Sequence, residues 1–177
     1  GRLFSPKVAS VVSLTPFRPA ERFDAKPSTL PVVFFCHMTE SCAPLVALDT
    51  TWAYRELTLR AAQAGHADIL FMEDAQIGEN YACWHREGYQ TAMKEAGLVQ
   101  QETVFSTYDQ SSMEQFLKTL VKKKRVTAII SGSLQLTEEA LLPAIHELGI
   151  PIPEQFSIFT LGCTTLPWDE RKTSTGI

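Results

Sequence analysis

Apolar and polar positions change their spacing along this chain in a way that separates helices from strands. In "AAQAGHADILFM" (Ala61–Met72), good helix formers end at Gly65, and an apolar run, Ile69–Met72, follows two residues after the Gly-His pair. Glycine closes many helices because it adopts the left-handed backbone conformation without a steric penalty. The pattern therefore predicts a helix that ends at Gly65 and a buried strand over 69–72.

The same order of helix, glycine, polar link and apolar strand occurs twice more. It is found in "AMKEAGLVQQETVF" (Ala92–Phe105) and in "AIHELGIPIPEQFSIF" (Ala144–Phe159). Parallel strands need a crossover connection, and a helix of this length is the usual one. We therefore predict an α/β fold whose parallel sheet carries helices on both faces.

The remaining apolar runs and helical spacings predict the other elements. Strands are expected at 8–14, 30–36, 45–48, 103–107, 126–133 (with its terminal turn) and 156–162. Helices are expected at 51–64, 81–96, 137–149, and from Ser111 or Ser112 to the lysines at 122–124. The segment 73–80 is expected to be a polar loop. Gly88, inside a predicted helix, suggests close packing against another backbone.

Composition and charge narrow the class of protein. The 177 residues are 45% apolar and 10% aromatic, which suffices for one large or two small domains. The net charge of −4 leaves no basic surplus to neutralise phosphates, so this chain alone is not expected to bind nucleic acid. The basic run at 122–125 is interpreted as a solvated helix end, where cations suit the helix dipole.

The cysteines and the hydropathy bear on the compartment. The four cysteines, at 36, 42, 83 and 163, are too scattered for a zinc pair, and an α/β chain of this size needs no disulfides. No secretory leader and no apolar run near eighteen residues is visible. We therefore expect a cytoplasmic protein without a membrane span.

Catalytic, metal and cofactor motifs are not found in the pattern. Cys36 and His37 are adjacent on a predicted strand, so their side chains point to opposite faces. Neither that pair nor Cys83 and His85 closes around a tetrahedral ion, and no Gly-rich phosphate loop follows a strand. We predict no enzyme activity, metal or cofactor, and interpret Cys36, Cys83 and Cys163 as small buried hydrophobes.

Ligands in open parallel sheets bind beyond the carboxyl ends of the strands. This rule selects Cys36–His37, Glu73–Asp74, Thr107–Tyr108, Ser131–Ser133 and Gly162–Cys163. Next to them, the helical stretch "YACWHREGY" places Tyr81, His85 and Tyr89 one turn apart on one face. Two interpretations stay open: aromatic core packing, or a face that stacks on a sugar or base.

Several segments, in this order, resemble the effector-binding region of the lactose- and galactose-repressor family. They are "LPVVFFC", "AGHADILFM", "REGYQTAMKEAGL", "ELGIPIPEQFSIFTL" and "KTSTGI", and the resemblance covers nearly the whole chain from Val8 onward. It implies a periplasmic-binding-protein-like fold of type I, with two doubly wound parallel-sheet lobes.

The resemblance also implies an organisation and partners. The first lobe, incomplete, would occupy 1–72, the second 73–172, and 173–177 would cross back. A small effector, a sugar or sugar derivative, would bind in the cleft of a homodimer. It would change the affinity for operator DNA of a helix-turn-helix headpiece that is absent from this sequence.

The strand-end rule, the helix face and the resemblance together give eight candidate effector-binding residues. They are Cys36, Asp49, Tyr81, His85, Tyr108, Ser133, Gly162 and Cys163. The family usually has arginine at the position of His85. Arg86 is one position away, about 100° around the helix. We expect His85→Ala to weaken effector binding by about 1–3 kcal/mol and to leave the stability nearly unchanged.

Two other functions are compatible with an α/β fold of this kind. A solute-binding protein of a sugar transporter shares the bilobed fold, but it requires a secretory leader, and the unpaired-looking cysteines count against it. An enzyme ranks third, because no catalytic constellation is found, although folds of this class host many activities.

Overall fold

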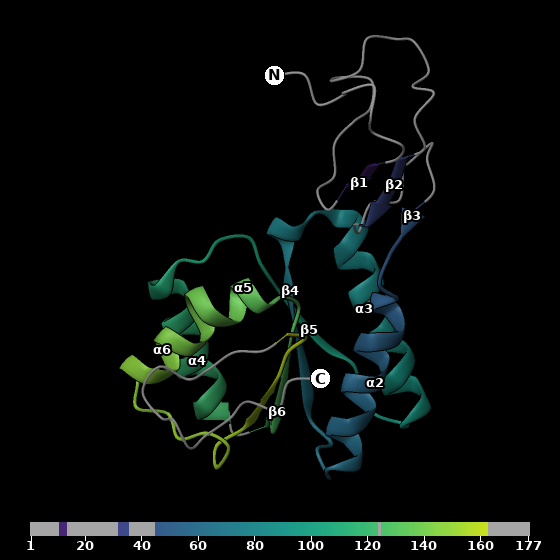
Figure 1. Ribbon diagram of the computed structural model, residues 1–177. Coiled ribbons are helices and arrows are strands. Elements are labelled where there is room, and N and C mark those ends of the chain that lie inside the picture. The colour runs from purple at the N-terminus through teal and green to yellow at the C-terminus, as the bar shows by residue number, and fades with distance from the viewer. Residues whose placement is uncertain (1–10, 14–31, 36–44, 124, 163–177) are drawn as a thin grey trace. The chain divides into compact units, whose positions relative to one another are not determined.

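The computed structural model describes residues 11–13, 32–35, 45–123 and 125–162 (Figure 1). The chain forms two compact units, residues 1–49 and 50–177. In the first unit, three strands pair in parallel in the order β1 (Val11–Ser13), β2 (Val32–Phe35) and β3 (Leu45–Val46). Strands were predicted at all three places, with longer bounds.

The second unit is built on a four-stranded sheet, all of whose pairings are parallel. Its order is β5 (Gln101–Phe105), β4 (Ile69–Asp74), β6 (Ala128–Ser131) and β7 (Ser157–Phe159). All residues of β4 and β6 are buried. Continuous apolar runs are typical of parallel strands that are covered on both faces.

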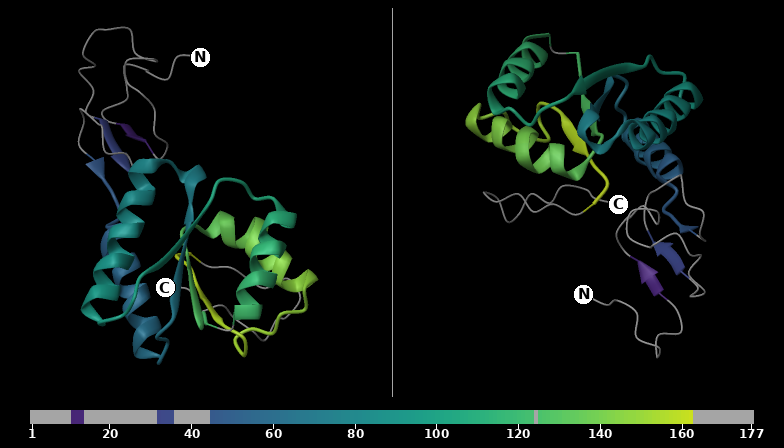
Figure 2. Two further views of the ribbon diagram at one scale, coloured as in Figure 1. Left: turned by 180° about the vertical axis from the view of Figure 1, so that it is seen from behind. Right: turned by 90° about the horizontal axis from the view of Figure 1, so that it is seen from above.

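Helices cover both faces of this sheet (Figures 1 and 2). On one face α2 (Thr50–Gln63) and α3 (Glu79–Glu95) form a core of Tyr54, Leu57, Tyr89 and Met93 with Phe71 of the sheet. The other face is covered by α4 (Gln110–Lys123), α5 (Leu134–Leu136), the π-helical segment η2 (Thr137–Leu141) and α6 (Leu142–Glu147). The predicted doubly wound α/β arrangement is confirmed in this unit.

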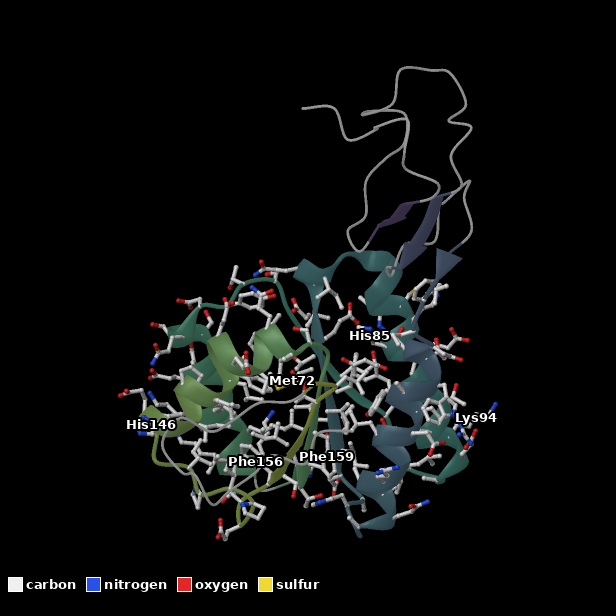
Figure 3. All side chains as sticks on the ribbon, in the orientation of Figure 1. Met72, His85, Lys94, His146, Phe156 and Phe159 are labelled. Atoms are coloured by element: carbon white, nitrogen blue, oxygen red, sulfur yellow. The ribbon has the colours of Figure 1, made fainter. Side chains whose placement is uncertain are left out.

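Interior and surface side chains separate as the pattern requires. Figure 3 shows Met72 and Phe156 within the layers, whereas Lys94 and His146 lie at the periphery. On α4, Met113 and Leu117 are buried, and the basic residues Lys122 and Lys123 end the helix in an exposed position, as predicted.

The predicted boundary between the lobes, at 72/73, differs from the boundary between the compact units, which lies at 49/50. The reason is the position of β4, which pairs with β5 on one side and with β6 on the other. Helix α2 packs on α3 and on the same sheet, so it belongs to the same unit. Residues 173–177 lie outside the described residues.

Several element bounds also differ from the prediction. Glu73 and Asp74 were expected in a loop, but they extend β4, and the short 3₁₀ turn η1 (Ala75–Ile77) follows. Strand β5 begins two residues earlier than predicted, and α3 begins at Glu79. The N-terminus of α4 is capped by Asp109, whose carboxylate accepts the Ser112 amide at 2.8 Å, rather than by a serine. Hydrogen bonding from the side chain of Ser112, and then from its backbone amide, lowers the pKa of Asp109.

Gly88 of α3 lies directly against the backbone of α2, as predicted. A Cβ at this position would overlap the carbonyl oxygen of Thr51 and lie 3.0 Å from the amide nitrogen of Arg55. Because both neighbours are backbone atoms of a helix, they cannot move aside independently. The contact therefore sets how closely α2 and α3 approach.

We expect Gly88→Ala to lower the free energy of unfolding by about 1–3 kcal/mol, the usual cost of overpacking. In an open helix the same change would raise stability by about 1 kcal/mol, so the sign is diagnostic. Urea unfolding followed by circular dichroism measures the difference, with the exposed neighbour Glu87→Ala as control. A Gly88→Ala variant as stable as the wild type would contradict the close approach.

Candidate functional site

The order of the sheet reverses between β4 and β6. From β4 the chain passes through α3 to β5 on one side, and then through α4 to β6 on the other side of β4. At such a switch point the connections diverge and leave a crevice beyond the carboxyl ends of the two strands. In this chain the two ends carry Asp74 and the turn Ser131–Ser133.

Asp74 gathers three hydrogen-bond donors around a fully buried carboxylate. Its Oδ2 accepts the hydroxyl of Tyr108 at 2.8 Å and the hydroxyl of Ser133. Its Oδ1 accepts the backbone amide of Gln76 at 2.9 Å. Within the described part of the chain, no lysine, arginine or histidine lies within ion-pair distance of this carboxylate. Uncharged donors alone therefore stabilise its charge.

Tyr108 and Ser133 are held by this contact. Burial raises the pKa of Tyr108 to about 12, and the hydrogen bond to Asp74 and the charge of that carboxylate add to the rise. The oxygen of Ser133 also caps α5, because it accepts the backbone amide of Leu136 at 2.9 Å. Both side chains are half-buried, so each keeps some solvent-exposed surface.

The carbonyl of Gly132 is the second polar centre of the site. It accepts the hydroxyl of Tyr54 at 2.7 Å and lies 3.0 Å from Nδ1 of His85. Because a carbonyl only accepts, Nδ1 carries the proton. The two rings stack with their centroids 4.2 Å apart. Burial raises the pKa of Tyr54 above its ordinary value, and Asp74 contributes.

Gly132 also has no room for a side chain. A Cβ would lie 2.8 Å from the carbonyl oxygen of Met72 and 2.9 Å from the amide nitrogen of Asp74, both on β4. The turn after β6 therefore presses against the end of β4. This close approach brings Ser133 within hydrogen-bond distance of Asp74.

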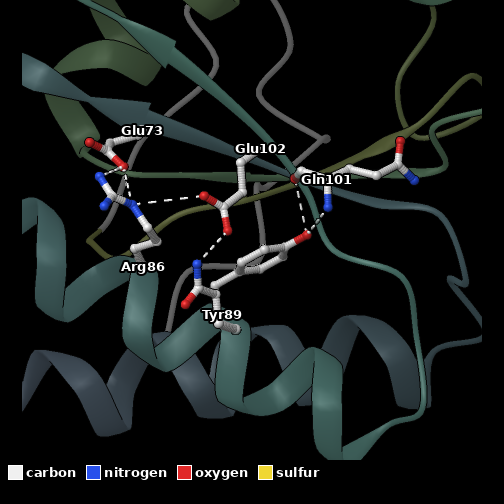
Figure 4. Close-up of polar contacts among 6 residues, drawn as sticks. Glu73, Arg86, Tyr89, Gln101 and Glu102 are labelled. Carbon is white, nitrogen blue, oxygen red and sulfur yellow. Dashed lines mark hydrogen bonds and ion pairs between the residues drawn. The ribbon is translucent and has the colours of Figure 1, made fainter.

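A separate polar network joins α3 to the sheet (Figure 4). Arg86 donates to the buried carboxylate of Glu73 and lies 3.8 Å from Glu102. Gln90 donates to the other oxygen of Glu102 at 2.8 Å. The hydrogen bond to Glu73 raises the pKa of Arg86. Arg86, considered from the sequence as a cation for an effector, is thus engaged by two carboxylates.

The stretch "YACWHREGY" contributes to the core through Tyr89. Its hydroxyl donates toward the carbonyl of Ile69 at 2.9 Å. It also donates toward the carbonyl of Gln101 at 3.0 Å and accepts the amide of Gln101 (Figure 4). Its ring stacks on Phe71 at 5.2 Å. Burial raises the pKa of Tyr89 to about 12. Of the two interpretations of this stretch, core packing or a face that stacks on a ligand, core packing therefore describes Tyr89.

The predicted site residues have different outcomes. Tyr108 and Ser133 come together on Asp74, and Gly162 lies beside Leu134, next to Ser133. His85 is buried behind Gly132, and Asp49 is exposed in the first compact unit. The positions outside the described residues, or whose side chain is not described, are Cys36, Cys163 and Tyr81.

Neither Tyr54 nor, beyond its place at a strand end, Asp74 stands out in the sequence pattern. Tyr54 recurs with Leu57 and Ala61 at helical spacing, so it has the pattern of an ordinary core residue. Cys83, interpreted as a buried hydrophobe, is exposed on α3. No three His, Cys, Asp or Glu side chains among the described residues are grouped to hold a metal ion. No helix within the described ranges could cross a membrane.

The burial of His85 changes the expected effect of its removal. We expect His85→Ala to lower the free energy of unfolding by about 2–3 kcal/mol, because it opens a cavity beside Tyr54 and removes a donor from the buried Gly132 carbonyl. Denaturant unfolding measures this, with the exposed neighbour Cys83→Ala as control. An unchanged stability would show that His85 does not occupy this packed position.

Comparisons with known proteins place the fold. No protein-family model matches the sequence, and neither does any curated protein. The probable maltose operon transcriptional repressor of Staphylococcus aureus superposes with a TM-score of 0.68 and 17% identity, over 91% of this chain and 59% of that one. The transcriptional repressor AscG of Escherichia coli matches with a TM-score of 0.64 and 16% identity, over 89% and 59%.

A third structure contains a ligand. The periplasmic binding protein/LacI transcriptional regulator of Alkaliphilus metalliredigens, in complex with D-xylulofuranose, superposes with a TM-score of 0.60 and 17% identity, over 76% of this chain and 50% of that one. The chain thus spans between half and three fifths of the length of these structures. It has the periplasmic-binding-protein-like α/β fold that they share.

Proposed function

We propose that this chain is part of the ligand-sensing domain of a LacI-type transcriptional regulator. In this function a small polyhydroxylated molecule, a sugar or sugar derivative, binds at the carboxyl ends of β4 and β6. Its binding changes the affinity for operator DNA of a helix-turn-helix headpiece outside these 177 residues. The fold shared with three transcriptional regulators supports the proposal.

The observation that carries the proposal is the polar cluster at the topological switch point. Tyr108 offers an aromatic ring and a phenol oxygen, and Ser133 offers a hydroxyl beside it. Aromatic surface with a few fixed polar atoms suits a ligand that has apolar ring faces and hydroxyl edges. The same edge of the sheet carries Gly162 after β7.

The proposed effector contacts include the other sequence candidates. We infer Tyr108, Ser133 and Gly162 as contacts from the second unit. Asp49, Tyr81, Cys36 and Cys163 belong to the proposal through the family resemblance alone. His85 supports the site from behind, through the carbonyl of Gly132. The first unit, 1–49, would contribute to the first lobe, and the regulator would act as a homodimer in the cytoplasm.

The alternative of a solute-binding protein for a sugar transporter uses the same fold. The three solved structures described above are all named as transcriptional regulators or repressors. The two functions differ in what ligand binding does, since a regulator must change its affinity for DNA and a solute-binding protein need not.

We expect a sugar or sugar derivative to raise the melting temperature of the full-length protein and to change its affinity for operator DNA. A ligand that binds only the native state adds about 2.7 kcal/mol to the free energy of unfolding when its free concentration is 100 times its Kd. Thermal-shift screening followed by fluorescence anisotropy with operator DNA measures both effects. A ligand that binds without any effect on DNA affinity would favour the transporter alternative, and no hit among sugars would contradict the proposal.

We also expect the purified 177-residue chain to bind duplex DNA no better than a neutral control protein, since its net charge is −4. Anisotropy titrations at two salt concentrations test this. A salt-sensitive Kd below about 1 μM, tighter than the usual non-specific range, would place a DNA-binding surface within the chain. It would contradict the proposal that DNA is bound by a headpiece outside these 177 residues.

A further inference from the structure

The hydroxyl groups of Tyr108 and Ser133 donate to the same acceptor atom. Each hydroxyl carries a single proton, and both protons point at Oδ2 of Asp74. Hydrogen bonds to an ionised carboxylate are about twice as strong as bonds between neutral groups. A ligand that needs these protons would have to compete with a buried carboxylate for them.

What remains on the two oxygens is acceptor capacity. The oxygen of Ser133 already uses one lone pair on the backbone amide of Leu136, at 2.9 Å. The phenol oxygen of Tyr108, half-buried, has two lone pairs, and the hydroxyl of Ser133 lies close enough to interact with one of them, which leaves the other as an acceptor. Toward the crevice, therefore, these side chains can accept hydrogen bonds and cannot donate them.

The charged side chains around the site also disfavour an anionic ligand. Within the described part of the chain, the guanidinium of Arg86 on α3 is engaged by Glu73 and Glu102. Glu139 on η2 lies close enough for its charge to help raise the pKa of Tyr108. Asp74 is balanced by no cation among the described residues. A carboxylate or phosphate group would meet acceptors and negative charge.

We propose that Asp74 is a positioning residue that makes Tyr108 and Ser133 hydrogen-bond acceptors, so that the site binds neutral or amine-bearing sugars and excludes sugar acids and sugar phosphates. The inference rests on the proposed ligand-sensing function and adds the ligand class. Asp74 itself, fully buried, acts through the two hydroxyls and needs no contact with the ligand.

Asp74→Asn reverses the direction of these hydrogen bonds. The Gln76 amide, 2.9 Å from Oδ1, requires an acceptor at that end of the side chain, so the oxygen of asparagine must stay there. The NH₂ group then occupies the position of Oδ2 and donates to Tyr108 and Ser133. Their own protons turn toward the crevice and become available to an anionic ligand.

The experiment uses calorimetric titration of the full-length protein with matched sugars. The panel contains the neutral, 2-amino and uronic acid forms of D-glucose, D-galactose and D-mannose, with D-xylose, D-ribose and D-ribose 5-phosphate. For the wild type we expect binding of at least one neutral or amino sugar, at least tenfold tighter than its uronic acid form. For Asp74→Asn we expect this preference to fall by about tenfold or more, equivalent to about 1.4 kcal/mol.

Glu73→Gln is the matched control. It removes one negative charge from the adjacent residue of β4, but Glu73 contacts neither of the two hydroxyls, and its partner Arg86 keeps Glu102 at 3.8 Å as a second carboxylate. A purely electrostatic effect of the lost charge would change both variants alike. The proposal requires that the preference changes in Asp74→Asn and stays within about twofold of the wild type in Glu73→Gln.

A second variant covers the case in which Asp74→Asn does not fold. Tyr108→Phe removes the acceptor oxygen and leaves Asp74 with Ser133 and Gln76, so neutral sugars should bind about tenfold more weakly while anions stay excluded. Unchanged affinity for neutral sugars in Tyr108→Phe would overturn the proposal.

The remaining outcomes separate this inference from the proposed function. A uronic acid or phosphate that binds the wild type at least as tightly as the neutral sugars would overturn the role of Asp74 and leave ligand sensing intact. Equal changes in Asp74→Asn and Glu73→Gln would do the same. No binding by any member of the panel would instead contradict the proposed function itself.

Discussion

The close approach of the turn after β6 to the end of β4 is the constraint on which the site depends. Gly132 leaves no space between the two backbones, and its carbonyl is held by Tyr54 and by His85. These donors come from α2 and α3, so the packing of both helices fixes the turn. An unpaired buried carbonyl would cost about 1–3 kcal/mol, which explains why two buried rings are placed there.

The same approach brings a buried carboxylate next to the turn. Asp74 would be costly to bury without partners, and three uncharged donors from η1, from the segment after β5 and from the turn satisfy it. The polar atoms of the edge are therefore preorganised before any ligand arrives. A site that is already hydrogen-bonded selects ligands by what it still offers, and here it offers acceptors.

The comparisons identify the fold, whereas the ligand has to be inferred from the side chains at the site. At 16–17% identity, these three structures share the fold with this chain, while side chains at the edge of the sheet can differ freely. Arg86 illustrates the difference, since it lies on α3 near the switch point and is taken up by Glu73 and Glu102. Fold alone therefore does not state which ligand is bound.

The sequence by itself determined the alternation of helices and strands and the parallel sheet covered on both faces, because these follow from local periodicity and from the crossover that parallel strands require. A glycine inside a predicted helix also suggested the close packing at position 88. The sequence also placed Tyr108 and Ser133 at strand ends. Tertiary structure alone decided that Asp74 extends β4, that Tyr54 reaches Gly132 from 78 residues away, and that His85 is buried. Hydrogen bonds between distant segments leave no periodic signal, so only the folded chain reveals them.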